Sequence, residues 1–82
     1  MDKYVVILID GKRKRAVTIE EKSDDDARKH VEGFLLWNRW KKSELYKHDS
    51  YSPAMENSYL LLSSAVKNGR EVKWNDSNLK PI

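Results

Sequence analysis

The chain lacks cysteine, and histidine, glycine and proline are scarce: its 82 residues include two histidines, three glycines and two prolines. Without cysteine it can form no disulfide framework, thiolate metal site or cysteine nucleophile. His30 and His48 cannot by themselves complete the usual four-ligand zinc site. With glycine this scarce, and placed mostly at expected turns or caps, no phosphate-binding glycine loop is available. We therefore predict that the protein is not an enzyme and holds no metal or cofactor.

Long apolar runs are also absent. No run approaches the ~18 apolar residues that a membrane span needs. The chain does not open with the charged, apolar and small-residue pattern of a signal peptide either. These absences predict a soluble, cytoplasmic protein with no membrane partner. The length predicts a single domain, residues 1–82, in which residues 75–82 form an irregular tail.

Positive charge is present in modest excess, and it is unevenly distributed. The formal net charge is +3 and the pI is about 9.2. Residues 1–19 carry five Lys/Arg against two Asp, whereas residues 20–26 carry five acids against one Lys. Residues 27–48 again carry an excess of Lys/Arg, six against two Glu. The densest cationic stretch is Lys12-Arg13-Lys14-Arg15, directly after Asp10-Gly11.

The sequence predicts an N-terminal β-hairpin. The β-branched run 4–9 ends at Asp10-Gly11, a pair typical of two-residue hairpin turns, and residues 16–19 resume the β pattern. With this turn, Ile9 faces Lys12 and Val6 faces Arg15. One face of the hairpin then carries Tyr4, Val6, Leu8, Val17 and Ile19. The other carries Val5, Ile7, Ile9, Ala16 and Thr18. The first strand is thus apolar on both faces, which indicates neighbouring elements near both.

A helix is predicted from about Asp24 to Lys42. Ser23 can cap its start, and the three aspartates that follow suit the positive end of the helix dipole. Lys41 and Lys42 would suit the negative end. The apolar stripe of this helix comprises Ala27, Val31, Phe34, Leu35 and Asn38. Both charge blocks are thereby explained without a ligand.

Two interpretations of the second half remain open after a predicted loop at residues 43–52. Ser52-Pro53 and the helical spacing of Met55, Tyr59, Leu62 and Val66 favour a helix that ends at Asn68-Gly69. The same Asn-Gly pair can instead turn a hairpin between strands 60–67 and 70–74. Residues 71–74 form a final strand in both. The favoured fold class is therefore α+β in the order ββααβ, and the alternative is ββαββ.

The candidate binding residues are aromatic and basic. On the predicted helix, Leu36 and Trp40 point away from the apolar stripe, and Trp37 lies toward its edge. Either the second helix covers them or they are exposed as an interaction surface. Alternate residues of a strand face opposite ways, so only two of the four consecutive cations can serve one surface. The predicted binding residues are Trp37, Arg39, Trp40, Lys41, Lys42, Lys12, Arg13, Lys14 and Arg15.

Three functions stay open, beside the simpler interpretation that the cations only keep an edge strand soluble. The favoured one is a small inhibitor or adaptor that docks on a protein partner. In size, charge and surplus of aromatics the chain resembles small accessory proteins of phages and mobile elements. The second is a nucleic-acid-binding protein that uses the basic hairpin tip and the end of the first helix. The third sequesters a small anionic ligand, such as a nucleotide, at a homo-oligomer interface.

Overall fold

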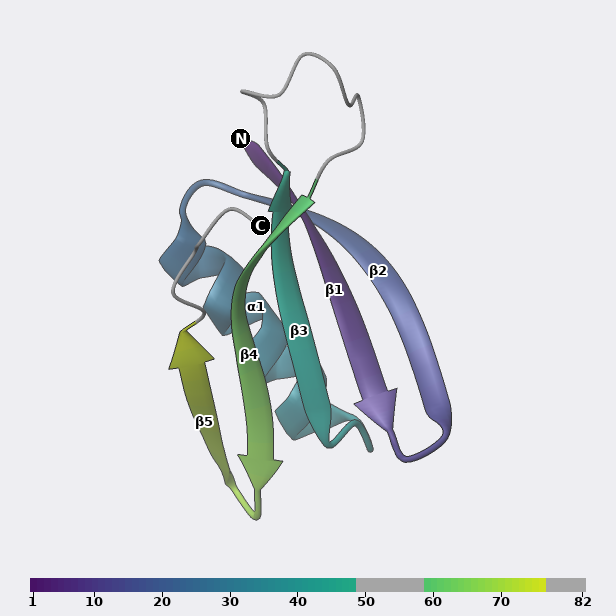
Figure 1. Cartoon of the computed structure of the whole chain (residues 1–82). Coiled ribbons are helices and arrows are strands. Elements are labelled where there is room, and N and C mark those ends of the chain that lie inside the picture. The colour runs from purple at the N-terminus through teal and green to yellow at the C-terminus, as the bar shows by residue number, and fades with distance from the viewer. Residues whose placement is uncertain (49–58, 77–82) are drawn as a thin grey trace.

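The computed structural model describes residues 1–48 and 59–76. Five strands and one helix are described there: β1 (Asp2–Asp10), β2 (Arg13–Glu21), α1 (Asp24–Trp37), β3 (Lys42–His48), β4 (Tyr59–Asn68) and β5 (Glu71–Asp76). The strands form one antiparallel sheet in the order β2-β1-β3-β4-β5, and α1 lies across one of its faces (Figure 1). The small α+β domain predicted from the sequence is confirmed.

The predicted order ββααβ is wrong. Residues 59–68 form strand β4, not a helix, and the hairpin alternative is right, although Asn68 pairs with Glu71 and the turn residues are Gly69 and Arg70 instead of Asn68 and Gly69. The alternative order ββαββ still lacks β3. Strand β4 satisfies the backbone hydrogen-bonding groups along the edge of β3 that faces away from β1, and this requirement overrides the helical spacing. The predicted helix start at Pro53 lies outside the described residues.

Strand β3 replaces the end of the predicted helix and part of the predicted loop. Helix α1 stops at Trp37, and Asn38 is extended, with φ −132° and ψ 176°. The backbone nitrogen of Lys41 then donates to the carbonyl oxygen of Ile9 at 3.0 Å, which starts β3 beside β1. The strand continues β-type pairing as far as His48. At the other end of the chain, β5 takes up two residues of the predicted tail, and the rest of that tail lies outside the described residues.

The first hairpin turns at Gly11-Lys12 instead of Asp10-Gly11. Asp10 pairs with Arg13, and Gly11 has a φ of 57°. A positive φ at only the first of the two turn residues is typical of a type II′ turn. The observed register differs from the predicted one by two residues. Because a shift of two leaves each side chain on its original face, the predicted faces of β1 and β2 are right.

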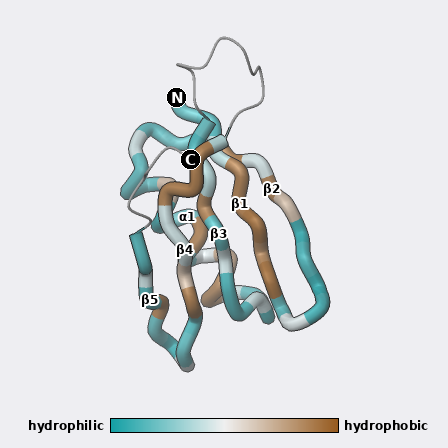
Figure 2. The backbone as a smooth tube through the Cα atoms, in the orientation of Figure 1, coloured by the Kyte–Doolittle hydropathy of each residue, from teal (hydrophilic) through white to brown (hydrophobic). Residues whose placement is uncertain are grey.

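The core fills the space between the sheet and α1. Its buried members are Tyr4, Val6, Leu8, Ile19, Ala27, Val31, Leu35, Leu45, Leu62 and Ala65. Figure 2 shows the long hydrophobic run of β1 between β2 and β3. The predicted helical stripe is confirmed as far as Leu35, since Ala27, Val31 and Leu35 are buried and Phe34 packs beside them. Its last predicted member, Asn38, is wrong, because this residue is exposed and lies beyond the end of α1.

Both ends of α1 are held by hydrogen bonds. At its start, the Ser23 Oγ accepts from the backbone nitrogen of Asp26 at 3.2 Å, as predicted. The last turn contains no basic residue of its own. Instead the Nζ of Lys67, from β4, donates to the carbonyl oxygens of Leu35 at 2.6 Å and Asn38 at 2.9 Å. Lys67 therefore supplies a cation at the negative end of the helix dipole, where positive charge is favourable.

Replacing Lys67 should destabilise the fold. Lys67→Met keeps most of the aliphatic stem but removes the donors and the charge at the helix end. We expect the free energy of unfolding, measured by urea denaturation, to fall by about 1–2 kcal/mol. The exposed Lys73→Met is the matched control and should change it by less than about 0.5 kcal/mol. Equal stabilities of the two variants would show that water satisfies these carbonyls as well as Lys67 does.

Two glycines should respond to alanine with opposite signs. Gly69 has a φ of 66° in the β4–β5 turn, a conformation that costs an L-residue roughly 1–2 kcal/mol. Gly33 lies within α1, and an added Cβ there meets no atom within 4 Å. Gly69→Ala should therefore lower the free energy of unfolding, whereas Gly33→Ala should raise it by roughly 0.5–1 kcal/mol. An unchanged stability of Gly69→Ala would contradict the positive φ of Gly69 in this turn.

Candidate functional site

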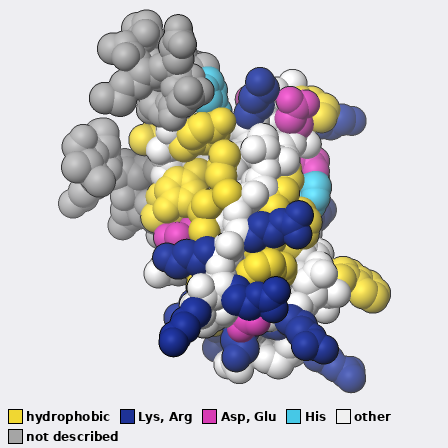
Figure 3. All heavy atoms as spheres, turned by 90° about the vertical axis from the view of Figure 1, so that its right-hand side faces the viewer, with side chains coloured by type: hydrophobic (Ala, Val, Ile, Leu, Met, Phe, Trp, Pro, Cys, Tyr) yellow, Lys and Arg dark blue, Asp and Glu magenta, His cyan; other side chains and the backbone are white. Residues whose placement is uncertain are grey.

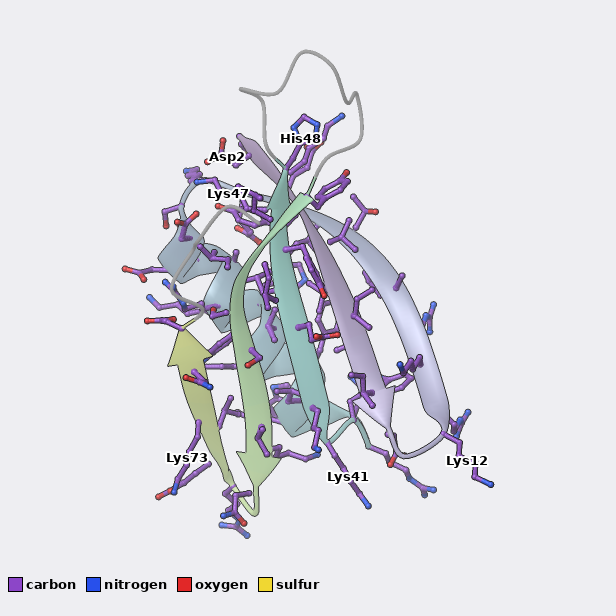
Figure 4. The ribbon with its side chains drawn as sticks, viewed as in Figure 1. Asp2, Lys12, Lys41, Lys47, His48 and Lys73 are labelled. Atoms are coloured by element: carbon purple, nitrogen blue, oxygen red, sulfur yellow. The ribbon has the colours of Figure 1, made fainter. Side chains whose placement is uncertain are left out.

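Lys and Arg side chains gather at one end of the sheet. Antiparallel pairing brings the β1–β2 turn, the start of β3 and the β4–β5 turn to the same end, where α1 also finishes. We call this end the basic end, and its ten cations are Lys12, Arg13, Lys14, Arg15, Arg39, Lys41, Lys42, Lys67, Arg70 and Lys73. Asp10 and Glu71 lie among them. Figure 4 shows Lys12, Lys41 and Lys73 at this end, and Asp2, Lys47 and His48 at the other.

The structure brings the two predicted basic stretches together. An open pocket of about 280 Å³ is lined by Asp10, Arg13, Arg15, Asn38, Arg39 and Trp40. Residues 12–15 come from the first hairpin and residues 38–40 from the connection between α1 and β3. Sequence reasoning missed Arg70 and Lys73 as members of the same end, because it favoured a helix before them. The signal that could have found them was the hairpin alternative, which returns residues 70–73 to the tip of the sheet.

Of the four consecutive cations, Lys12 lies in the turn, and Arg13, Lys14 and Arg15 alternate between the two faces of the sheet. Arg15 pairs with Leu8, on the face that α1 covers. Lys14 pairs with Ile9, on the opposite face. The predicted alternation is therefore confirmed, and the basic end presents cations on both faces.

Carboxylates neutralise little of this charge. The Nζ of Lys41 lies 3.9 Å from the Oδ1 of Asp10, and the Nζ of Lys67 is engaged by carbonyl oxygens of α1. Within residues 1–48 and 59–76, none of the other cations of the basic end forms an ion pair. The positive charge is therefore available to an anionic partner.

The tryptophans differ from the predicted arrangement. Trp37 ends α1 with 87% of its surface exposed, and Leu36 beside it is 46% exposed. Trp40 follows the helix and is partly buried against the core. In the described part of the chain no second helix covers Leu36 and Trp37. The exposed aromatic of this region is therefore Trp37, whereas Trp40 has a packing role and also lines the pocket.

A hydrogen-bonded cluster at the opposite end joins β1, β3 and α1. The hydroxyl of the buried Tyr4 donates to the Oδ1 of Asp24 at 2.7 Å, and the Nζ of Lys47 donates to the same oxygen at 2.9 Å. Burial, followed by the bond to Asp24, raises the pKa of the Tyr4 hydroxyl above its ordinary value. Burial acts to raise the pKa of Asp24, but the bonds from Tyr4 and Lys47 outweigh it and lower that pKa. Because Tyr4 is inaccessible, this cluster is structural.

The Asp24 cluster should make stability depend on pH in the acid range. The folded-state pKa of Asp24 is lowered, so its contribution is present above the unfolded pKa of about 3.9 and is lost as the pH falls below it. The Asp24 side chain is 35% exposed, so solvent screens part of the effect. We expect Asp24→Asn to lower the free energy of unfolding by about 1–2 kcal/mol at neutral pH.

Urea denaturation at pH 7 and at about pH 3 tests this expectation. The difference in stability between wild type and Asp24→Asn should shrink at the lower pH, because the unfolded chain then takes up a proton at Asp24 more readily than the folded protein, in which the pKa of this carboxyl is lowered. Asp25→Asn is the control, since that side chain is 86% exposed and forms an ion pair with Arg28 on the helix surface. A difference that does not change with pH would contradict a role for the Asp24 charge.

No family model, curated protein or solved structure matches this chain. Among the described residues, no group of His, Asp and Glu side chains is arranged to hold a metal ion. The described helix is too short and too polar to cross a membrane. The basic end is therefore the feature from which a function is inferred.

Proposed function

We propose that the protein is a non-enzymatic binding protein whose basic end binds nucleic acid. The observation that carries this proposal is the gathering of ten Lys/Arg side chains from residues 12–15, 39–42 and 67–73, against Asp10 and Glu71 alone. Lys and Arg that neutralise phosphates release condensed counterions, which supplies much of the affinity of proteins for nucleic acid. Folding thus concentrates a modest net charge of +3 into one strongly positive surface.

The composition of the basic end favours nucleic acid over a protein partner. The centres of protein–protein interfaces are depleted of charged residues, and of lysine in particular. Six of the ten cations here are lysines, and three of the four arginines line a pocket. Arginine beside tryptophan suits phosphates and bases, because the guanidinium group binds phosphate through two parallel hydrogen bonds and an indole can stack on a base.

The pocket provides a local site for one phosphate group. Arg13 and Arg15 lie two residues apart on one strand, so their backbones are about 7 Å apart on the same face. Arg39 reaches the pocket from the other stretch of chain, and Trp40 forms part of its lining. A free nucleotide fits the same chemistry, so the hypothesis of a small anionic ligand is tested with the same pocket variants.

A protein partner is a second candidate, favoured by one observation. Leu36 and Trp37 are large, exposed and adjacent at the end of α1. Exposed apolar groups of this size mark interaction sites, and tryptophan is enriched among the residues that dominate binding energy. If the protein is an inhibitor or adaptor, Trp37 replaces Trp40 as the residue on which docking depends.

Fluorescence anisotropy with labelled probes tests the nucleic-acid proposal. We would titrate ~15-nucleotide single-stranded and duplex probes at about 50 and 200 mM salt. The double variant Arg13→Ala/Arg39→Ala should weaken binding at least tenfold and reduce the salt dependence by roughly 0.7 in log–log slope for a single strand, because the contact with the phosphate in the pocket is lost. Lys22→Ala/Lys29→Ala removes the same charge away from the basic end and should leave affinity nearly unchanged.

Two outcomes would contradict the proposal. An equal loss of affinity in the two double variants would show that binding depends on net charge in general and not on a site at the basic end. No binding of either probe at about 50 mM salt would remove the nucleic-acid function. The second candidate is tested by nuclease-treated pull-downs: a protein retained by the wild type and lost with Trp37→Ala would support docking through Trp37.

A further inference from the structure

The face of the sheet opposite α1 is not covered by any of the described elements (Figure 1). Along β1, the half-buried Val5, Ile7 and Ile9 alternate with the fully buried residues that face the helix. We call this surface the open face. Figure 3, which looks onto the β2 side of the molecule, shows hydrophobic side chains on the side of the open face and Lys and Arg side chains around the lower end. The open face is therefore apolar in its upper part and meets the basic end below.

A row of lysines crosses the open face at right angles to the strands. The register places Lys14 beside Ile9, Ile9 beside Lys42, Lys42 beside Val66, and Val66 beside Lys73. Successive lysines are thus two strands apart, or about 9.5 Å. Each lysine comes from a different strand, and one apolar side chain, Ile9 or Val66, separates it from the next. We call Lys14, Lys42 and Lys73 the lysine row.

An aromatic side chain lies above the lysine row. Tyr46 stands on β3 between Val5 of β1 and Leu61 of β4 in cross-strand register. All three are half-buried, so part of each is accessible on the open face. On β3, Glu44 lies between Tyr46 and Lys42, and its negative charge repels phosphate. The face therefore offers cations along one line and apolar, aromatic surface along a parallel line.

We propose that single-stranded nucleic acid lies across the open face, with phosphates along the lysine row and bases against Tyr46 and its aliphatic neighbours. This inference rests on the proposed function and extends it from the basic end to one face of the sheet. A single strand exposes both the phosphates and the apolar faces of its bases, whereas a duplex buries the base faces in its stack. Sheets with accessible aromatic side chains bind unpaired bases in this way.

Charge complementarity favours this occupant over a second copy of the chain. A copy packed on the open face would bury the lysine row and Glu44, and buried charges cost free energy unless each finds a well-placed partner. A single strand neutralises the lysines with its phosphates and leaves Glu44 beside the bases, where its carboxylate can accept hydrogen bonds from exocyclic amino groups.

Anisotropy titrations of a ~15-nucleotide single strand and its duplex test the inference with four variants. Lys42→Ala should reduce the log–log slope of affinity against salt by about 0.7, because one phosphate contact is lost. Tyr46→Leu should weaken single-strand binding roughly 5- to 100-fold with an unchanged slope, because stacking is lost and charge is not. Tyr46→Phe keeps the ring and should therefore bind a single strand more tightly than Tyr46→Leu does. Lys29→Ala removes a charge from the helix and should bind as the wild type does.

The outcomes separate this inference from the proposed function. If Lys42→Ala and Tyr46→Leu bind normally while Arg13→Ala/Arg39→Ala does not, the strand avoids the open face, and the inference fails while the basic end stands. Duplex binding as tight as single-strand binding would also overturn it. A dimer in solution that Tyr46→Leu dissociates would show that a second copy occupies the face. No binding of any probe would overturn both proposals. Circular dichroism establishes that each variant is folded.

Discussion

The arrangement of this molecule depends on one helix covering one face of a wide sheet. The 14 residues of α1 span about 21 Å, and the helix runs from Asp24 at one end of the sheet to the basic end, where Lys67 contacts its last carbonyl oxygens. Every fully buried large side chain consequently lies on that side, from Tyr4 of β1 to Leu45 of β3. The opposite face keeps an apolar centre without a covering element among those described. Because the single described helix covers one face of the sheet, the other face is left as a surface suited to binding.

Antiparallel topology then decides where charge accumulates. Two tight turns, each with a glycine at positive φ, return the chain to the same end at which α1 finishes. The cations of three distant stretches meet there, and among the described residues their mutual repulsion is relieved by Asp10, by Glu71 and by the carbonyl oxygens that Lys67 contacts. Like charges held together in this way cost stability in the free protein, and an anionic partner reverses that cost.

Local signals were sufficient for about half of the fold. The first hairpin, the faces of β1, the capped start of α1 and its buried stripe were predicted because turn residues, alternation and Ser23 act within a few residues of one another. Strand β3 was missed because its alternating side chains include Leu45 as the one fully buried large apolar residue. Without β3, nothing in the sequence required a strand at residues 59–68, so the helical spacing of Tyr59, Leu62 and Val66 misled the prediction.

Even less of the candidate site than of the fold could be predicted from local sequence signals. Arg13, Arg15 and Arg39 were identified singly, but only the fold brings them to one pocket. Lys14, Lys42 and Lys73 belong to three strands that are far apart in the sequence, so no motif can reveal that they lie in one row. Trp40 was predicted as a binding residue because tryptophan is common at interaction surfaces. In the structure, the chain after α1 directs it toward the core instead. On such a surface many modest contacts share the affinity for nucleic acid. The dependence of that affinity on salt therefore reports the binding mode more directly than the effect of replacing any single residue.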